Sequence, residues 1–374
     1  MHLMKIKQKR NSIARTVQQR QSVPAAAPIG YRALVFLLSA IIPPSANASG
    51  IAADHQAPAY QQPTIQVTAN GTPEVNIQTP GADGVSHNVY SQFDVGSKGV
   101  ILNNARTNAQ TQLGGWIQGN PNLANGSARV ILNEVNSSQP SQLNGYVEIG
   151  GQRAELVIAN PAGINVNGGG FINASRATLT TGKPVFQNGN LAGYQVTNGS
   201  ININGSGLDG SSTDYTDILA RAINVNAGIW ANQIRLVAGS NDISPDGSLI
   251  TPTTGDANKP GFGIDVSQFG GMYAGKITLI GTEAGVGVHN AGQIGASDNL
   301  VLNANGELTN SGQITSQGTT TAQTNVIDNS GTIYAQGNAQ LNANGDITNS
   351  GRILAQGNLG LDAATDVVNL VGAI

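Results

Sequence analysis

Short stretches of alternating apolar and polar residues, separated by glycine or asparagine, recur along the carboxyl-terminal part of the chain. Leu300 and Leu302 flank a third residue, and Ile314 follows Gly312 at the same spacing. An alternation with a period of two is typical of β-strands, and glycine supplies the positive φ angles that tight turns need. No stretch has a helical period long enough to cross over a parallel sheet. The pattern therefore predicts many short strands joined by turns.

These strands belong to a repeat of about 20 residues. The triplet Asn-Ser-Gly begins at residues 310, 329 and 349, and the related Asn-Ala-Gly begins at 290. Three short strands in each repeat predict an all-β fold, a right-handed parallel β-helix whose coils stack ~4.8 Å apart. A leucine-rich repeat is the nearest alternative, but its leucine framework is missing. The asparagines of the triplets are expected to stack as a hydrogen-bonded ladder with a structural role.

The two ends of such a stack need protection, because the last strands would otherwise be unpaired. Residues 49–100 are less periodic and are expected to form an amino-terminal cap, and hairpins are expected outside the coil. At the other end, Leu370 and Val371 follow Asn369 where earlier repeats have Ser-Gly. This loss favours a fragment of a longer rod, and a short protein with an apolar cap is the alternative.

Two Asn-Pro motifs interrupt the less regular part of the chain. One comprises Asn120, Pro121, Asn122 and Leu123, and the other comprises Asn160, Pro161, Ala162, Gly163 and Ile164. Asn-Pro is a turn signal, because asparagine tolerates unusual backbone angles and proline fixes φ. The two motifs start two repeat lengths apart, which predicts that both lie on the same edge of the rod, two coils apart. They form either structural corners or a docking surface.

Composition supports an elongated β-protein over a compact enzyme. The 374-residue chain has 49 glycines, no cysteine, and only 10% charged and 4% aromatic residues. Disordered chains are instead rich in lysine, glutamate and proline. Exported proteins often contain disulfides, but a chain that crosses a second membrane unfolded would be trapped by them, so the absence of cysteine fits export.

The positive charge is concentrated at the amino terminus. Residues 1–50 contain no acidic side chain, so all of the 21 acidic residues lie in the remainder. That acidic body lacks the basic surface of a nucleic-acid-binding protein. The basic stretch is followed by the apolar residues 33–42 and by Ala46-Asn47-Ala48, the order of a secretory signal peptide. Cleavage is predicted between Ala48 and Ser49. A transmembrane anchor is the alternative, but the apolar run is shorter than the ~20 residues of a membrane span.

Sequence signatures of catalysis or metal binding are weak. The chain has no P-loop and no G-x-S-x-G motif, and none of its four histidines has metal-site spacing. Gly205–Gly210 matches a dinucleotide-binding pattern, but no βαβ unit surrounds it, so a turn is favoured. Asp209, Asp214 and Asp217 lack calcium-loop spacing and are expected in a solvated loop. Asp265 and Glu283 are read as isolated acids, although β-helical enzymes can place carboxylate pairs on adjacent coils.

The long basic signal, the two Asn-Pro motifs and the β-helical repeats together resemble the amino-terminal secretion domain of two-partner secretion exoproteins. This family includes filamentous haemagglutinin adhesins, secreted haemolysins and contact-dependent growth-inhibition toxins. Further segments carry the resemblance along nearly the whole chain: Tyr90–Val95, Lys98–Asn104, Arg153–Ala159, Gly271–Ile277 and Gly285–Gly292. The family commonly has asparagine at the position of Ala162, which weakens any specific role for that side chain here.

The resemblance implies an order of domains and a route of export. Residues 1–48 would be the signal peptide, residues 49–290 the secretion domain and residues 291–374 haemagglutinin-like repeats, truncated at the end. The inner-membrane secretion machinery would export the chain to the periplasm of a Gram-negative bacterium. Periplasmic domains of an outer-membrane β-barrel transporter would then recognise it, with both Asn-Pro motifs as the recognition residues. The chain would cross this membrane unfolded and fold outside.

The resemblance also limits the function at the cell surface. It implies an export and structural module without catalysis or cofactor, heading a rod that serves adhesion or contact-dependent toxin delivery. A receptor on a host or neighbouring cell is a further expected partner, and nucleic acid is not. The alternatives are the amino-terminal domain of a haemolysin and a β-helical polysaccharide-active enzyme.

Overall fold

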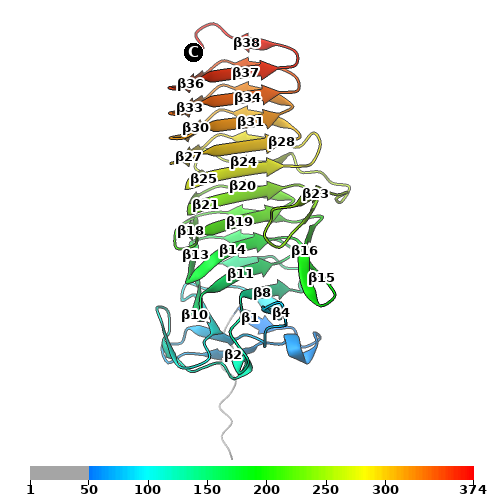
Figure 1. Ribbon diagram of the computed structural model, residues 1–374, viewed down its shortest axis with the longest axis vertical. Coiled ribbons are helices and arrows are strands. Elements are labelled where there is room, and N and C mark those ends of the chain that lie inside the picture. The colour runs from blue at the N-terminus through cyan, green and yellow to red at the C-terminus, as the bar shows by residue number, and fades with distance from the viewer. Residues whose placement is uncertain (1–49) are drawn as a thin grey trace, which may run out of the picture. The chain divides into compact units, whose positions relative to one another are not determined.

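Three faces of parallel strands form the coils in the computed structural model, which describes residues 50–374. In each repeat the chain passes through the first, second and third face in turn, and each strand pairs with its equivalents in the neighbouring coils (Figure 1). Alternate side chains point into the coil, where one continuous apolar core extends from Ile51 to Ile353. The predicted all-β parallel β-helix is therefore confirmed.

The first face is a ten-stranded parallel sheet. Its strands are β9 (Ser141–Leu143), β12 (Ile164–Val166), β17 (Ser200–Ile203), β20 (Ala222–Val225), β24 (Phe262–Val266), β26 (Gly287–Asn290), β29 (Glu307–Asn310), β32 (Val326–Asn329), β35 (Ile347–Asn349) and β38 (Val367–Asn369).

The second and third faces share two long strands, β21 (Gly228–Ala238) and β25 (Gly271–Gly281), which run through both. The other strands of the second face are β3 (Pro73–Asn76), β5 (Val100–Asn104), β10 (Tyr146–Gly151), β13 (Gly169–Ile172), β18 (Leu208–Gly210), β27 (Gln293–Ala296), β30 (Gln313–Ser316), β33 (Thr332–Ala335) and β36 (Arg352–Ala355). The other strands of the third face are β4 (Val85–Phe93), β8 (Val130–Val135), β11 (Ala154–Ala159), β14 (Ala174–Thr180), β19 (Tyr215–Ala220), β28 (Leu300–Ala304), β31 (Thr320–Thr324), β34 (Ala339–Ala343) and β37 (Leu359–Ala363).

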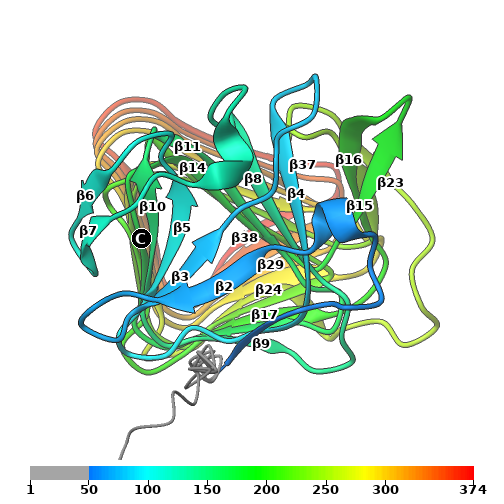
Figure 2. The same cartoon turned by 90° about the horizontal axis from the view of Figure 1, so that it is seen from below.

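The expected cap and extra-helical hairpins are also present. In the cap, β1 (Ile51–Ala53) pairs antiparallel with β4, and β2 (Thr64–Val67) pairs antiparallel with β3, with a 3-10 turn η1 (Ala59–Gln61) between them. The hairpin of β6 (Ala109–Thr111) and β7 (Gly115–Ile117) lies outside the second face. A four-stranded antiparallel sheet, here called the side sheet, lies outside the third face (Figure 2). It consists of β15 (Lys183–Gln187), β16 (Asn190–Val196), β22 (Asn241–Ile243) and β23 (Ile250–Pro252).

The asparagine ladder predicted from the triplets is confirmed. Asn290 donates from Nδ2 to Oδ1 of Asn310 at 2.7 Å, and the same bond links Asn310 to Asn329, Asn329 to Asn349 and Asn349 to Asn369 at 2.7–2.8 Å. The first four side chains are buried, so each amide satisfies its neighbour where water has no access. The strands continue across residue 290 without a gap, because β26 pairs with both β24 and β29. The domain boundary placed there stays a prediction.

Candidate functional site

The first Asn-Pro motif forms a buried turn between the β6–β7 hairpin and β8. Asn120 caps a single 3-10 turn, η2 (Pro121–Leu123), by accepting at Oδ1 a hydrogen bond of 3.0 Å from the main-chain N–H of Asn122. Its Nδ2 donates to the carbonyl oxygens of Ile77 and Asn103, both at 2.9 Å. The residue is 3% exposed, so its polar atoms are turned inward and fully used.

The neighbours of Asn120 fix the same turn. Pro121 is exposed and sits at the first position of η2, where its fixed φ suits the turn and its missing N–H costs nothing. Asn122 donates from Nδ2 to the carbonyl of Ile77 at 3.0 Å, and Leu123 is fully buried in the main core. Arg106 donates from Nε to the carbonyl of Leu123 at 3.2 Å. The motif thus connects the cap to the first coils.

The second motif repeats the arrangement at Asn160. Its Oδ1 accepts from the main-chain N–H of Ala162 at 2.9 Å, and its Nδ2 donates to the carbonyl of Gln139 and to Oγ of Ser141, both at 3.0 Å. The main-chain N–H of Asn160 donates to the carbonyl of Thr180 at 2.9 Å. Asn160 is completely buried, so this turn fastens its coil to the coils on both sides.

The end of the second motif explains its residue types. Gly163 has a φ of +120°, and a Cβ there would lie 2.9 Å from the carbonyl oxygen of Ser200 in the next coil. Glycine is therefore required on both conformational and steric grounds. Ile164 begins β12 and is fully buried. Ala162 contributes its main-chain N–H, and an asparagine in its place would add a side chain at a half-buried position.

The prediction that both motifs lie on one edge, two coils apart, is wrong. Asn120 lies between β5 on the second face and β8 on the third, whereas Asn160 lies between β11 on the third face and β12 on the first. Since β8 pairs directly with β11, the motifs occupy adjacent coils at different corners. The coil between these strands is longer than the later repeats, because Glu155 pairs with Val130, which is 155 − 130 = 25 residues earlier. The rest of the spacing between the two motifs arises because Asn120 precedes β8, whereas Asn160 follows β11.

The predicted signal peptide and its cleavage site lie outside the described residues. Ala46, Ala48 and Ser49 all precede Gly50, the first residue that the structure describes. Within residues 50–374 the helical segments are single 3-10 turns, and no helix there has the length and apolar character needed to span a bilayer.

Asp217 is not in a solvated loop as expected. It lies on β19 with its side chain 4% exposed, 2.7 Å from Nη1 of Arg176 and 3.0 Å from Nε of Arg235. Arg235 also donates to the main-chain carbonyls of Asp246 and Gly247, which lie in the loop between β22 and β23. The cluster thus fastens the side sheet to the third face. Burial by itself would lower the pKa of Arg176, but the charge and hydrogen bond of Asp217 raise that pKa overall.

The other two aspartates are also held by neighbours. Asp214 accepts from Arg153 in an exposed ion pair of 2.9 Å. Asp209 accepts from Oη of Tyr146 at 2.8 Å, and this hydrogen bond raises the pKa of Tyr146. Around Gly205–Gly210 the chain forms a turn, as predicted, with positive φ at Gly205 and Gly207. In residues 50–374 no group of three or more histidine or acidic side chains is placed to hold a metal ion.

The acids read as isolated also have partners. Glu283 pairs with Arg221 at 2.9 Å, and the two side chains are only 11% and 5% exposed. The hydrogen bond from Arg221 to Glu283 raises the pKa of Arg221. Oδ1 of Asp265 lies 2.7 Å from Nδ1 of His289 on the neighbouring strand β26. The pair of Asp265 and His289 joins adjacent coils, whereas Glu283 and Arg221 lie two coils apart, on either side of the coil that contains β21. Spacing along the chain indicates neither pair.

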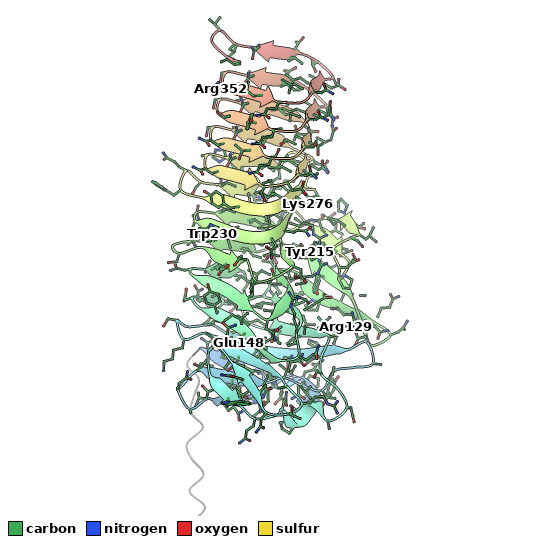
Figure 3. All side chains as sticks on the ribbon, turned by 60° about the vertical axis from the view of Figure 1, so that its left-hand side comes forward. Arg129, Glu148, Tyr215, Trp230, Lys276 and Arg352 are labelled. Atoms are coloured by element: carbon green, nitrogen blue, oxygen red, sulfur yellow. The ribbon has the colours of Figure 1, made fainter. Side chains whose placement is uncertain are left out.

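Glu148 is a structural residue that the sequence did not single out. Its two carboxylate oxygens accept from the main-chain N–H groups of Gln112 and Leu113, both at 2.7 Å, in the turn between β6 and β7. The buried carboxylate therefore fastens the hairpin to the second face (Figure 3 labels Glu148). Its one available signal was an acid on a strand that is otherwise mostly apolar.

The fold and the two buried turns define a class, the parallel β-helices with Asn-Pro corners in their first coils. The TPS secretion domain family matches residues 49–316, and the chain belongs to this family. The resemblance to two-partner secretion exoproteins is thereby confirmed.

Curated relatives and a solved structure agree with this assignment. The chain is 53% identical over 300 residues to "Toxin CdiA" of Yersinia pestis, an alignment covering 80% of this chain and 9% of that protein. It is 47% identical over 281 residues to "tRNA nuclease CdiA-2" of Burkholderia pseudomallei (strain 1026b), covering 74% of this chain and 9% of that protein. The crystal structure of a filamentous hemagglutinin secretion domain superposes with a TM-score of 0.67 at 30% identity, covering 86% of this chain and 100% of the other.

Proposed function

We propose that the coils within residues 49–316 are an export module recognised by the periplasmic domains of an outer-membrane β-barrel transporter. Membership of the TPS secretion domain family is the observation that carries this proposal. The signal peptide directs the chain through the inner membrane, and the transporter passes it to the outside of a Gram-negative cell. The repeats then extend as a rod at the cell surface.

The burial of Asn120 and Asn160 suggests when the motifs are recognised. In the folded coils both residues are 3% exposed or less, and all their bonds are made to the chain itself. A transporter that contacts these amides therefore does so before the coils form. Folding outside the membrane would bury them and withdraw the motif from the transporter. Because each coil pairs only with its neighbours, folding can proceed coil by coil as the chain emerges.

The relatives favour contact-dependent toxin delivery over adhesion and over a haemolysin. The names of both curated relatives describe a toxin or a nuclease. The chain spans only 9% of either relative, so the nuclease named for one of them belongs to that whole protein. We propose that the present coils have no catalysis of their own. The burial of Glu283 against Arg221 and the pairing of Asp265 with His289 support this over polysaccharide cleavage.

An export assay tests the recognition role. The chain is expressed with its transporter, and the protein in the medium and in the periplasm is quantified by immunoblot. Asn120→Ala and Asn160→Ala are expected to lower the amount in the medium several-fold and to leave the chain in the periplasm. Unchanged export of both variants would show that the transporter does not recognise these asparagines.

A folding control separates recognition from architecture. Asn310→Ala removes an equally buried amide from the ladder, outside both motifs. If it reduces export as strongly as Asn120→Ala does, the motifs act only by stabilising the fold. Thermal unfolding of the three refolded variants checks that their stabilities are comparable.

A further inference from the structure

One outward-facing row on the second face carries aromatic side chains beside an open position. In the paired strands β21, β25, β27, β30 and β33, this row consists of Trp230, Tyr273, Gly295, Thr315 and Tyr334. Gly295 leaves a gap one coil wide next to Tyr273. Trp230 lies at the surface of the stack (Figure 3).

The first two rings lie flat against the sheet because each follows a glycine by two residues. A Cβ on Gly228 would lie 2.5 Å from Cη2 of Trp230, and one on Gly271 would lie 2.8 Å from Oη of Tyr273. The two rings are stacked at 6.3 Å between centroids and 19° between planes. Trp230 is still 46% exposed and Tyr273 39% exposed. One face of each ring therefore covers a glycine, while the pair presents an aromatic platform to solvent.

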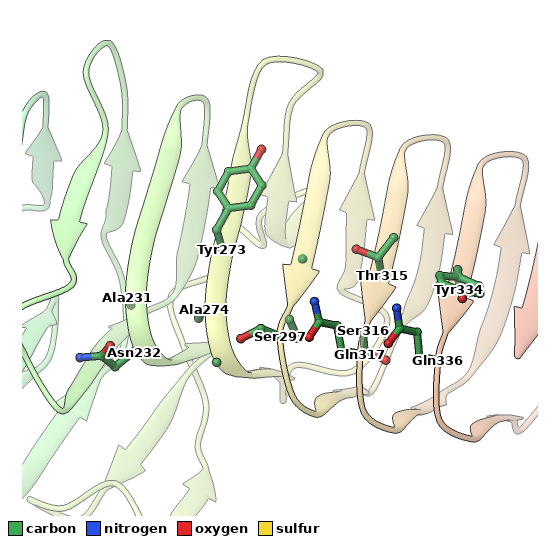
Figure 4. Close-up of a pocket in the computed structure, with 13 residues that line it drawn as sticks. Ala231, Asn232, Tyr273, Ala274, Ser297, Thr315, Ser316, Gln317, Tyr334 and Gln336 are labelled. Carbon is green, nitrogen blue, oxygen red and sulfur yellow. The ribbon is translucent and has the colours of Figure 1, made fainter. Parts of the chain in front are cut away.

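A groove of about 730 Å³ runs along the stack beside Tyr273, the half of the platform that lines it (Figure 4). Gly295 is also part of its lining. Ala231 and Asn232 line one end, one coil before Tyr273, and Tyr334 lines the other. Tyr273 and Tyr334 lie three coils apart. At the coil repeat of ~4.8 Å this is a length of about 14 Å. The groove is open and shallow, so it suits an extended ligand.

Amide and hydroxyl groups follow one side of the groove at the coil repeat. Ser297, Gln317 and Gln336 directly follow β27, β30 and β33, and all three side chains are exposed (Figure 4). Asn232 extends the same side toward the platform. Among the described residues that line the groove, none carries a charge. A ligand there meets groups that both donate and accept hydrogen bonds, and no ion-pair partner.

We propose that this groove binds an uncharged linear oligosaccharide whose chain runs along the stack. The C–H faces of a pyranose ring are apolar and pack on exposed aromatic faces, while its hydroxyls pair with amides. A polymer of repeating sugars suits polar partners that repeat with every coil. A peptide that adds as a strand would need a free strand edge, whereas the strands beside the groove are paired on both sides.

The site binds without cleaving. Glycoside hydrolysis requires two carboxyl groups on either side of the bond, and the described lining contains neither aspartate nor glutamate. Binding in this groove is independent of transporter recognition, because it is a property of the folded, purified chain.

Fluorescence of a single tryptophan tests the proposal directly. Trp116 and Trp230 are the two tryptophans of the chain, so Trp116→Phe leaves Trp230 as the sole reporter, stacked on Tyr273. Cellohexaose, maltohexaose and chitohexaose are titrated into this protein, with hexagalacturonate as the charged probe. A saturable change in emission is expected with at least one neutral hexasaccharide and not with hexagalacturonate. No saturable change with any neutral probe at millimolar concentration overturns the proposal, as does preference for hexagalacturonate.

Two variants in the same background locate the site. Tyr273→Ala removes half of the platform and is expected to weaken binding by about tenfold. Gly295→Leu fills the groove, and its Cβ has room because the nearest atom, Cδ1 of Tyr273, would be 3.5 Å away. Tyr215→Ala, an exposed tyrosine on the third face, is the matched control and should bind normally. Unchanged affinity in both groove variants, measured by isothermal titration calorimetry with circular dichroism as the check on folding, overturns the assignment.

Discussion

A single outward-facing row on the third face crosses both the irregular coils and the regular repeats, and its chemistry changes between them. In β19 and β21 this row contains Leu219 and Val237, whereas in β31 and β34 it contains Gln323 and Asn342. The strands pair in parallel throughout. Leu219 is 1% exposed and Val237 is fully buried, while Gln323 is exposed.

The side sheet accounts for the difference. Tyr194, Val196 and Ile243 of that sheet pack with Leu219 and Val237 in a second apolar core, separate from the core inside the coil. A strand covered on both faces needs apolar residues at consecutive positions, and a strand facing water needs alternation. The outward row of a coil is therefore apolar where the side sheet covers it and polar where it faces water. The coil fold by itself does not determine which residue types occupy that row.

The largest effect is expected from removing an apolar residue under the side sheet. Leu219→Ala should lower the free energy of unfolding by about 2–4 kcal/mol, because it deletes a fully packed side chain. Gln323→Ala, at the equivalent position of an uncovered coil, should change it by no more than about 0.5 kcal/mol. Urea denaturation followed by circular dichroism measures both. Equal losses in the two variants would contradict the role given to the side sheet.

Buried asparagines differ between the two regions in the same way. In the repeats each ladder amide bonds to an identical amide in the next coil, whereas Asn120 and Asn160 bond mostly to main-chain atoms and a serine. The ladder begins at Asn290, which pairs with Val266 on the preceding strand. Among the described residues, Oδ1 of Asn290 is one of two buried side-chain atoms without a hydrogen-bond partner. Within the ladder each amide therefore has a partner in the next coil, whereas Oδ1 of Asn290, at the start of the ladder, has none.

Interrupting the asparagine ladder should have an intermediate effect on the free energy of unfolding. Asn329→Ala leaves Nδ2 of Asn310 without its acceptor and Oδ1 of Asn349 without its donor, so a loss of about 1–3 kcal/mol is expected. Asn325 offers a matched control in the same coil, since it bonds Asn305 and Asn344 in an exposed row. Asn325→Ala should cost about 0.5 kcal/mol or less, because water replaces the lost partner.

Urea denaturation of the two variants makes this comparison. If Asn325→Ala lowers the free energy of unfolding as much as Asn329→Ala does, burial does not account for the contribution of the ladder to stability.

The regular coils could be predicted from the sequence because each position repeats in register. The Asn-Ser-Gly triplets at 310, 329 and 349 marked both the coil length and the ladder, and the structure confirms both. The fold class followed from this part alone. The family assignment rested on the ordered set of motifs, and the match to residues 49–316 confirms it.

The irregular coils were harder to predict because their lengths vary. The spacing of the two Asn-Pro motifs matches two regular repeats, and nothing in it shows that the coil from β8 to β11 is longer than a repeat. Spacing alone therefore predicts one edge for both motifs. The pairing of Asp217 with Arg176 and Arg235 joins residues from three strands, which linear spacing does not reveal. One signal for the side sheet was present, the consecutive apolar pair Ile218 and Leu219.

The smallest effect on stability is expected from a carboxylate in the turn of the side sheet. Asp246, between β22 and β23, accepts from Oγ of Ser244 at 2.6 Å and from the N–H and Oγ of Ser248. These bonds, led by that from Ser244, lower the pKa of Asp246 from 3.8 to about 2. A pKa below that of the unfolded chain means that the carboxylate stabilises the turn above about pH 4, and that this contribution is lost as the pH falls toward about 2.

Carbon-detected NMR titration of the Asp246 carboxyl measures this directly. A midpoint near 2 is expected in the unmodified chain, and Ser244→Ala should move the pKa of Asp246 upward toward 3.8 because the leading hydrogen bond is removed. The effect on stability should be small, since the carboxylate is exposed and solvent screens it. The same acidification should leave the outward row of β31 unchanged, because Gln323 and its neighbours there carry no titrating group. A midpoint near 3.8 in the unmodified chain would show that the serines do not hold this carboxylate in solution.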